Sequence, residues 1–155
     1  MTSSRPRQTI HGACLQIGSA GVLVLGPPGS GKSSLALELI DTPGHALGGP
    51  LLKARLVADD QVVIRREGNT LHASPPEELA GLLEVRGLGV VHVKHLPATR
   101  LRMVVMLAPW CEIERLPELE SYALLGLSLP LARIDPARPG APARLRAALV
   151  HLGLA

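Results

Sequence analysis

One short motif constrains the fold of this chain more than any other feature. Residues 26–33, Gly-Pro-Pro-Gly-Ser-Gly-Lys-Ser, match the pattern Gly-x4-Gly-Lys-Ser in full. The motif follows an apolar stretch at 20–25 and leads into 32–41, where Leu35 and Leu39 lie four residues apart, as on one face of a helix. Glycines let the backbone wrap around phosphate oxygens, and the helix adds its positive N-terminal end. The motif therefore predicts a strand, a phosphate-binding loop and a helix in succession.

The predicted loop is a candidate nucleotide site. We expect Lys32 to reach the β- and γ-phosphates of a nucleotide and Ser33 to offer its hydroxyl to Mg²⁺. The alternative is an accidental glycine turn, but the chance of such a match in 155 residues is on the order of 0.01 or less. The loop alone does not name a reaction, because kinases, ATPases and GTPases share it. The predicted nucleotide-binding residues are Gly26, Pro27, Pro28, Gly29, Ser30, Gly31, Lys32, Ser33 and Ser34.

The remaining periodicity predicts more strands than helices. Without an internal repeat, we expect residues 1–155 to form a single domain with an α/β fold and a mixed sheet, rather than a simple doubly wound one. A stretch rich in glycine and proline, 42–52, is predicted to be a surface loop. Predicted helices cover 32–41, a short segment at 75–78, and 143–152. Predicted strands cover 9–17, 20–25, 55–58, 61–66, 70–73, 83–86, 89–93, 101–107 and 133–134.

Composition excludes several classes of protein. The chain has no Phe, one Trp and one Tyr, so it lacks the aromatic platforms on which nucleic-acid bases stack. No run of about 18 apolar residues is present, and the basic amino terminus is not followed by an apolar segment, so we expect a cytoplasmic protein without membrane association. Two cysteines with no metal-like spacing exclude a disulfide or zinc framework. The net charge of +3 suits an anionic ligand.

A pair of carboxylates supplies candidate acid–base chemistry. Asp59 and Asp60 directly follow the apolar run 56–58, which places the pair at a strand end. Adjacent residues in a strand point to opposite faces, so we expect the two carboxylates to have different roles. One could hold Mg²⁺ while the other accepts the proton of an attacking hydroxyl. The alternative is a plain turn between two strands.

Three features in this order resemble one known family. They are the phosphate loop, the Asp59-Asp60 pair and the run Glu-Val-Arg-Gly-Leu-Gly-Val-Val at 84–91. Between His11 and Gly140 the chain resembles the catalytic domain of HPr kinase/phosphorylase, which acts on a seryl side chain of the phosphocarrier protein HPr. The resemblance implies a P-loop kinase fold like that of phosphoenolpyruvate carboxykinases. It also implies use of Mg²⁺ and ATP, HPr as the protein substrate, a hexamer, and a reverse reaction in which inorganic phosphate removes the seryl phosphate to give pyrophosphate.

The resemblance also implies roles for single residues. Asp60 is similar to the family's proton acceptor, which is the donor in the reverse direction, and Asp59 lies beside it. Ser33 and Glu84 resemble Mg²⁺ ligands. If the chain is a kinase, we expect Lys32 and Arg115 to stabilise the charge of the transferred phosphoryl group. His11 resembles a catalytic histidine, although a lone histidine near a strand start is more often a surface residue.

Two further segments resemble parts of the family's site. Arg115 resembles an arginine that acts on the phosphoryl group, although it could simply pair with a nearby glutamate. The sequence Arg138-Pro139-Gly140 resembles the loop linked to phosphorolysis. It is followed by Ala141 where the family carries a further arginine. Because a guanidinium fork can hold phosphate, we expect phosphorolysis to be impaired relative to kinase activity.

The chain also differs from full-length members of that family. Those members carry an additional amino-terminal domain, whereas the similar part begins almost at residue 1 here, so we expect a short form. A protein-serine kinase is the leading hypothesis. A small-molecule kinase or ATPase on the same loop, and a nucleotide-sensing module without turnover, are the alternatives.

Overall fold

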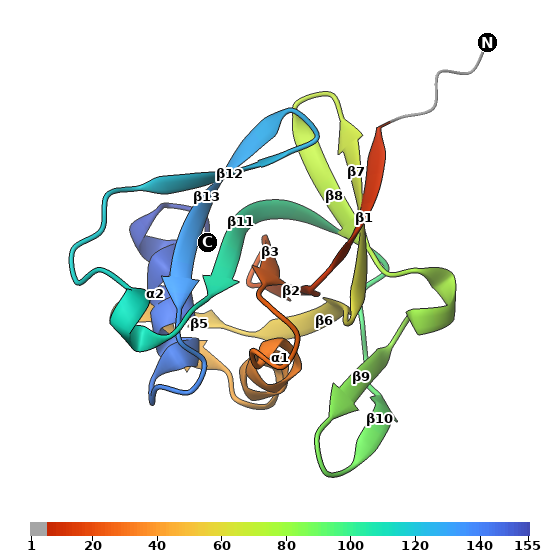
Figure 1. The fold of residues 1–155 in the computed structure, drawn as a ribbon, viewed down its shortest axis with the longest axis horizontal. Coiled ribbons are helices and arrows are strands. Elements are labelled where there is room, and N and C mark those ends of the chain that lie inside the picture. The colour runs from red at the N-terminus through yellow and green to blue at the C-terminus, as the bar shows by residue number, and fades with distance from the viewer. Residues whose placement is uncertain (1–5) are drawn as a thin grey trace.

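The computed structural model describes residues 6–155, so the first five residues of the basic amino terminus lie outside the description. Within that range the chain forms a mixed sheet of nine strands, two short hairpins and two α-helices (Figure 1). The helices are α1 (Lys32–Asp41) and α2 (Ala141–His151), with 3₁₀ turns η1 (Ala46–Gly48), η2 (Glu77–Leu79) and η3 (Trp110–Glu112). The strands are β1 (Arg7–His11), β2 (Ala13–Ile17), β3 (Ala20–Leu25), β4 (Gly44–His45), β5 (Leu51–Leu52), β6 (Ala54–Ala58), β7 (Gln61–Glu67), β8 (Thr70–Ser74), β9 (Leu82–Val85), β10 (Gly89–His92), β11 (Thr99–Leu107), β12 (Glu120–Leu124) and β13 (Leu127–Ile134).

Strand direction gathers several loops at one edge of the sheet. The order of the sheet is β1-β7-β8-β11-β3-β2-β6, and β13 pairs with both β11 and β12. β3, β11 and β13 run parallel, while β2 is antiparallel to both β3 and β6. Hence β6, β3, β11 and β13 all end at the same edge, where open α/β sheets commonly bind ligands.

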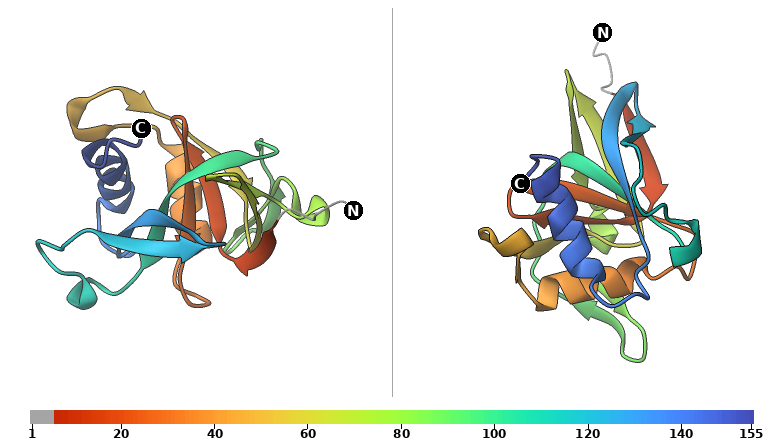
Figure 2. Two further views of the ribbon diagram at one scale, coloured as in Figure 1. Left: turned by 90° about the horizontal axis from the view of Figure 1, so that it is seen from above. Right: turned by 90° about the vertical axis from the view of Figure 1, so that its left-hand side faces the viewer.

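The core lies on both faces of β3, which explains why that strand is apolar throughout. Val22 and Val24 pack on one face with Leu35 of α1 and Leu145 of α2. Leu23 and Leu25 point to the other face of β3, where they pack with buried residues of β6, β7, β8 and β11. Because successive side chains of a strand alternate between faces, both faces need apolar residues. The two helices cover the first face, and Figure 2 allows both to be followed from two sides.

Several predicted elements are confirmed, and the mixed α/β class with them. The helix at 32–41 has the predicted bounds, and β3 spans 20–25 as expected. β6, β7, β8, β9, β10 and β11 match their predictions to within one or two residues. The predicted short helix at 75–78 is the 3₁₀ turn η2, and the closing helix begins at Ala141, two residues early, with Pro142 in its first turn.

Other predictions were wrong. The strand expected at 9–17 divides at Gly12 into β1 and β2, which pair with different strands. A Cβ atom at Gly12 would lie 2.8 Å from the Val24 carbonyl oxygen, so the chain passes too close to β3 for a side chain. The predicted surface loop at 42–52 contains the β4–β5 hairpin and buries Ala46 and Leu52. β12 and most of β13 had no prediction.

The buried guanidinium of Arg146 attaches the β4–β5 hairpin to α1 and α2. Arg146 of α2 donates hydrogen bonds to the carbonyl oxygens of Leu52 (3.1 Å), Leu39 (3.1 Å) and Thr42 (2.8 Å). Burial lowers the pKa of Arg146 from its usual value. Because Leu39 and Thr42 stand at the C-terminal end of α1, the positive charge also complements that helix.

Across residues 6–155 no helix is long and apolar enough to cross a membrane.

Candidate active site

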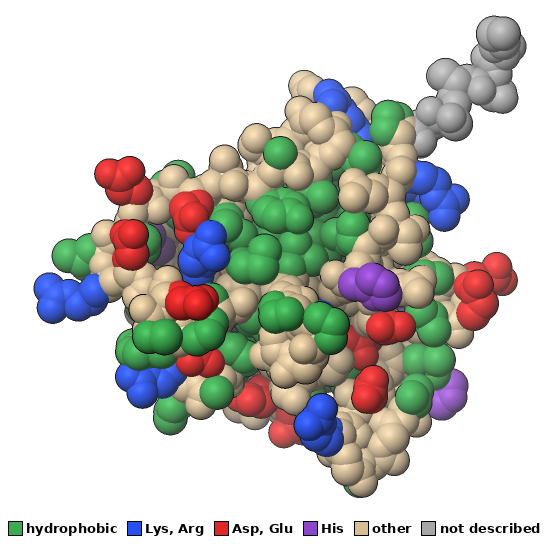
Figure 3. Space-filling view, in the orientation of Figure 1, with side chains coloured by type: hydrophobic (Ala, Val, Ile, Leu, Met, Phe, Trp, Pro, Cys, Tyr) green, Lys and Arg blue, Asp and Glu red, His purple; other side chains and the backbone are tan. Residues whose placement is uncertain are grey.

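A cleft of about 430 Å³ opens at the edge where β3 and β6 end. It brings together three predicted features that are far apart in the sequence: the phosphate loop, the aspartate pair and the Glu-Val-Arg-Gly run. Figure 3 shows acidic side chains gathered beside the β9–β10 hairpin, at the lower right of the molecule. The lining residues are Pro28, Gly29, Gly31, Lys32, Ser33, Ser34, Asp59, Asp60, Glu84 and Arg86.

The phosphate loop has the geometry that its glycines predict. Gly29 and Gly31 have φ values of 76° and 101°, a region that residues with a side chain rarely adopt. Gly31 caps α1 without a side-chain hydrogen bond, and the first turn of α1 carries no acidic residue. The N-terminal N–H groups of α1 and their positive dipole end are therefore free to face an anion. Lys32 is held on the loop, where its Nζ donates to the carbonyl oxygens of Gly26 (2.8 Å) and Pro27 (3.1 Å).

Asp59 joins the three parts of the cleft. The Ser33 hydroxyl donates to this carboxylate, with its Oγ 2.9 Å from Oδ1 and 3.1 Å from Oδ2. The backbone N–H of Glu84 donates to Oδ2 at 3.1 Å. Asp59 is only 5% exposed, so these hydrogen bonds satisfy a buried charge.

The oxygen atoms of this cluster fit Mg²⁺. A serine hydroxyl and a carboxylate are the hard oxygen ligands that this ion accepts, usually together with substrate phosphates and waters. Among residues 6–155 no three His, Cys, Asp or Glu side chains gather as a metal cage. Ser33 and Asp59, with Glu84 lining the same cleft, would therefore hold the ion in combination with a nucleotide rather than alone.

Asp60 lies in an unusual turn. Its φ of 70° is rare for a residue with a side chain, and the Gln61 N–H donates to the Asp59 carbonyl oxygen at 2.9 Å across it. The expectation that Asp59 and Asp60 point to opposite faces was wrong, because both follow the last strand residue, Ala58, and both line the cleft. The two carboxylates lie in different environments, since Asp59 is buried and Asp60 exposed. Strained turns of this kind often occur at functional sites.

The β9–β10 hairpin supplies the outer wall. Glu84 pairs with Val90 across the hairpin, while Leu83 points to the opposite face and is buried in the core. Arg86 also lines the cleft, although the sequence analysis gave it no site role. The available signal was its spacing, because Arg86 stands two residues after Glu84 near the end of a strand, which favours the same face.

Three predicted site segments do not line the cleft. His11 is exposed at the end of β1, although the next residue, Gly12, donates its N–H to the Asp60 carbonyl oxygen at 3.2 Å. Arg115 is exposed between η3 and β12. The predicted phosphorolysis loop, Arg138-Pro139-Gly140, lies between β13 and α2, with the Arg138 Cζ 4.3 Å from the centre of the Trp110 ring.

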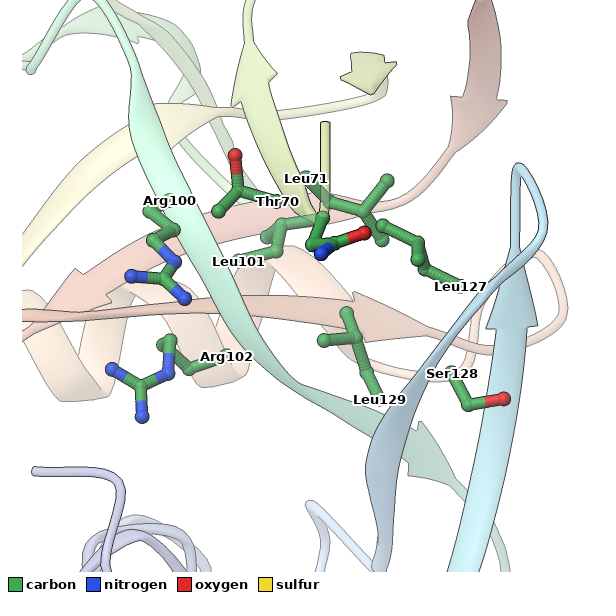
Figure 4. Close-up of a pocket in the computed structure, with 9 residues that line it drawn as sticks. Thr70, Leu71, Arg100, Leu101, Arg102, Leu127, Ser128 and Leu129 are labelled. Carbon is green, nitrogen blue, oxygen red and sulfur yellow. The ribbon is translucent and has the colours of Figure 1, made fainter. Parts of the chain in front are cut away.

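A second hollow of about 230 Å³ lies where β11 passes from β8 to β13. In Figure 4, Arg100 and Arg102 extend on one side of β11, whereas Leu101, Leu127 and Leu129 lie on the other. No carboxylate lines this hollow within the described part of the chain, so it lacks a proton acceptor. Of these two hollows, as lined by the described residues, the first cleft is the one that combines donors for phosphate with acidic groups.

Comparisons with known proteins point to one family. Residues 3–143 match the family model described as the HPr Serine kinase C-terminal domain. HPr kinase/phosphorylase of Geobacillus thermodenitrificans is 39% identical over 147 residues, which cover 87% of this chain and 44% of that protein. HPr kinase/phosphorylase of Xylella fastidiosa is 48% identical over 92 residues, or 59% of this chain and 26% of that protein.

A solved structure shares the fold. The HPr(Ser) kinase/phosphatase of Coxiella burnetii superposes with a TM-score of 0.78 at 24% identity, covering 95% of this chain and 97% of that one. The chain spans less than half the length of the curated relatives it matches. By the match of the family model over most of its length, the chain belongs to the family of the HPr serine kinase C-terminal domain.

Proposed function

We propose that this domain is a serine kinase that uses Mg²⁺ and ATP to phosphorylate a seryl residue of the phosphocarrier protein HPr. The observation that carries the proposal is the hydrogen-bonded link from Ser33 through Asp59 to Glu84. The link holds the Ser33 hydroxyl and the Asp59 carboxylate, two oxygen groups that suit a metal, beside the phosphate loop, and the exposed Asp60 lines the same cleft. The names of the full-length relatives, HPr kinase/phosphorylase, support HPr as the acceptor.

The residues divide the work of phosphoryl transfer. Lys32 and the N-terminal N–H groups of α1 bind the terminal phosphates, and their fixed positive charge stabilises the charge that develops on the transferred group. Ser33 and Asp59, with Glu84, would hold Mg²⁺, and the bound ion would supply positive charge against the charge of the phosphates. Asp60 accepts the seryl proton as the bond from the seryl oxygen to phosphorus forms. The bond from phosphorus to the leaving ADP oxygen breaks in the same step.

The reverse reaction is proposed to be slower. Phosphorolysis needs a site for inorganic phosphate, and the candidate loop offers Arg138 but has Ala141 in the position of a further arginine. Since the Arg138 guanidinium stacks on Trp110, it is not directed into the cleft lining. The hexamer and the cytoplasmic location implied by the family resemblance belong to this proposal as well.

The variant Asp60→Asn tests the proposal most directly. Because an amide cannot accept the seryl proton, transfer to HPr should fall by about 10²- to 10⁴-fold, while the ATP dissociation constant stays within about twofold. The measurements are mass spectrometry of phosphoserine on HPr and calorimetry of ATP binding. Asp41→Asn, at the exposed end of α1, is the matched control and should retain full transfer.

Two results would contradict the proposal. Transfer that is unchanged in Asp60→Asn would remove Asp60 from the proton step. ATP binding by the wild-type chain with no phosphate on HPr would favour another acceptor or a module that binds nucleotide without turnover.

A further inference from the structure

A carboxylate outside the cleft ties together the ends of two strands. Asp135 directly follows β13, and Trp110 lies shortly after β11. Asp135 Oδ2 accepts the backbone N–H of Trp110 at 2.9 Å, and Oδ1 accepts the backbone N–H of Ala137 at 2.9 Å. Both oxygens are therefore engaged by main-chain donors. Such charge-assisted hydrogen bonds are stronger than neutral ones, so Asp135 fixes how the chain leaves both strands.

The segment that follows, residues 136–140, is held at its other end by the Trp110 ring and α2. The Cζ atoms of Arg138 and Arg144 lie 4.3 Å and 4.8 Å from the ring centre, within the range of cation–π attraction. Arg144 also donates from Nη1 to the Pro139 carbonyl oxygen at 2.9 Å. We call Trp110, Asp135, Arg138 and Arg144 the clamp.

The clamped segment reaches the phosphate loop through Pro136. A Cβ atom built on Gly31 would lie 3.1 Å from Cγ of Pro136 and 3.4 Å from its Cβ, so the proline ring lies directly behind this glycine. Gly31 has a φ of 101° and caps α1, and its position sets the direction of the first N–H groups of that helix. A displacement of Pro136 would therefore reach the groups that face the phosphates, because close-packed atoms transmit small shifts.

We infer that Asp135 and Trp110 are positioning residues, which hold Pro136 against Gly31 and so set the shape of the phosphate loop from outside the cleft. This inference rests on the proposed function, since it assigns the clamp to the nucleotide site of the same reaction. It also makes the clamp a reporter, because a phosphate that tightens the loop around Gly31 changes the surroundings of the Trp110 ring.

Intrinsic fluorescence tests this coupling, since Trp110 is the only tryptophan of the chain. Its side chain is 41% exposed, so its emission is sensitive to small movements of the two guanidinium groups. Saturating Mg²⁺-ATP, with binding measured separately by calorimetry, should change the emission of the wild-type protein. Pro136→Gly removes the ring behind Gly31 and should abolish that change while ATP still binds. An unchanged wild-type emission with ATP bound would overturn the inference.

Substitutions in the clamp give a second measurement. Asp135→Asn keeps one acceptor oxygen, so one of the two backbone hydrogen bonds is lost and the ATP dissociation constant should rise by about three- to tenfold. Trp110→Ala should have an effect of the same size, whereas Trp110→Phe keeps a ring under both arginines and should restore most of the affinity. Glu118→Gln, an exposed carboxylate between η3 and β12, should change nothing.

The outcomes separate this inference from the proposed function. Wild-type ATP affinity in both Asp135→Asn and Trp110→Ala would show that the clamp does not position the loop. ATP binding that obeys these predictions without any transfer to HPr would remove the proposed acceptor and leave the clamp intact. A wild-type chain that binds no ATP would overturn both.

Discussion

The two walls of the cleft are built in different ways. The inner wall, formed by the phosphate loop and Asp59, lies directly at the ends of β3 and β6, whose residues are buried except for Arg55. The outer wall is the β9–β10 hairpin, which extends from the body of the molecule (Figure 1). Its side chains Leu88 and Val90 are exposed, and the hairpin pairs with no strand of the main sheet among the described residues.

This difference indicates what each wall can contribute. Groups on the inner wall are fixed before a nucleotide binds, which is the condition for electrostatic stabilisation of a transition state. On the outer wall, the Glu84 N–H bonds to Asp59 of the inner wall, whereas the bond from Val93 N–H to the Gly81 carbonyl oxygen closes the base of the hairpin itself. Leu83 anchors the hairpin in the core, but the tip around Leu88 has few buried contacts. Segments of that kind open at low free-energy cost, so the tip of the hairpin is the part of the outer wall that can adapt to an acceptor.

Among the variants that compare the two walls, the largest effect is expected on the inner wall, from Lys32→Ala. Under the proposed function, removal of the ammonium group takes away a charge that stabilises the transferred phosphoryl group, so the rate of transfer should fall by about 10²- to 10³-fold. The measurement is transfer of labelled phosphate from ATP to HPr. Lys53→Ala is the control, because Lys53 is exposed between β5 and β6 and does not line the cleft. Equal rates of transfer in the two variants would contradict the role of the inner wall in stabilising the transferred phosphoryl group.

A smaller effect is expected from Ser33→Ala, tested against its neighbour Ser34→Ala. The Ser33 hydroxyl donates to Asp59, whereas the Ser34 side chain is exposed and any contribution to phosphate binding comes from its backbone. Loss of the Ser33 hydroxyl should raise the Mg²⁺ concentration needed for half-maximal transfer by about 10- to 100-fold. Ser34→Ala should stay within about threefold of the wild type. A similar Mg²⁺ requirement in both variants would contradict a role for Ser33 at the metal.

The local structure of the inner wall was easier to predict from the sequence than that of the rest of the site, because it depends on residues that are neighbours in the chain. The phosphate loop and α1 depend on neighbouring residues, so their pattern is complete within a short window. A turn at Asp59-Asp60 was one of the two interpretations of the sequence, but the conformation of Asp60 was not predicted, because a positive φ at a non-glycine residue has no local signature.

The clamp, in contrast, could not be predicted from the sequence. The hydrogen bond from Trp110 to Asp135 joins residues 25 positions apart, and no motif marks it. The same holds for β12 and β13, where a proline at 130 and half-exposed side chains hide the alternation of a strand. These contacts form only when β11 and β13 lie side by side in the folded sheet, so the sequence alone does not predict them.

The smallest effect is expected at the root and the tip of the hairpin, from Gly81→Ala and Gly87→Ala. Both glycines have positive φ values, 77° and 90°, so alanine should cost each variant about 1 kcal/mol of backbone strain in the free energy of unfolding. At Gly81 the added Cβ would also lie 2.8 Å from Nδ1 of His95, whereas at Gly87 nothing lies within 4 Å. Gly81→Ala should therefore loosen the attachment of the hairpin, and Gly87→Ala should not.

Amide hydrogen exchange separates these two cases. Faster exchange at Glu84 and Val93 is expected in Gly81→Ala alone, because their N–H groups bond to Asp59 and to Gly81 at the root. ATP affinity should stay unchanged in both variants, since the phosphate loop belongs to the inner wall. The contrary result is a Gly81→Ala variant that loses ATP affinity and HPr phosphorylation to the same extent. The two walls would then act as one unit, and the hairpin would shape the nucleotide site rather than adapt to the acceptor.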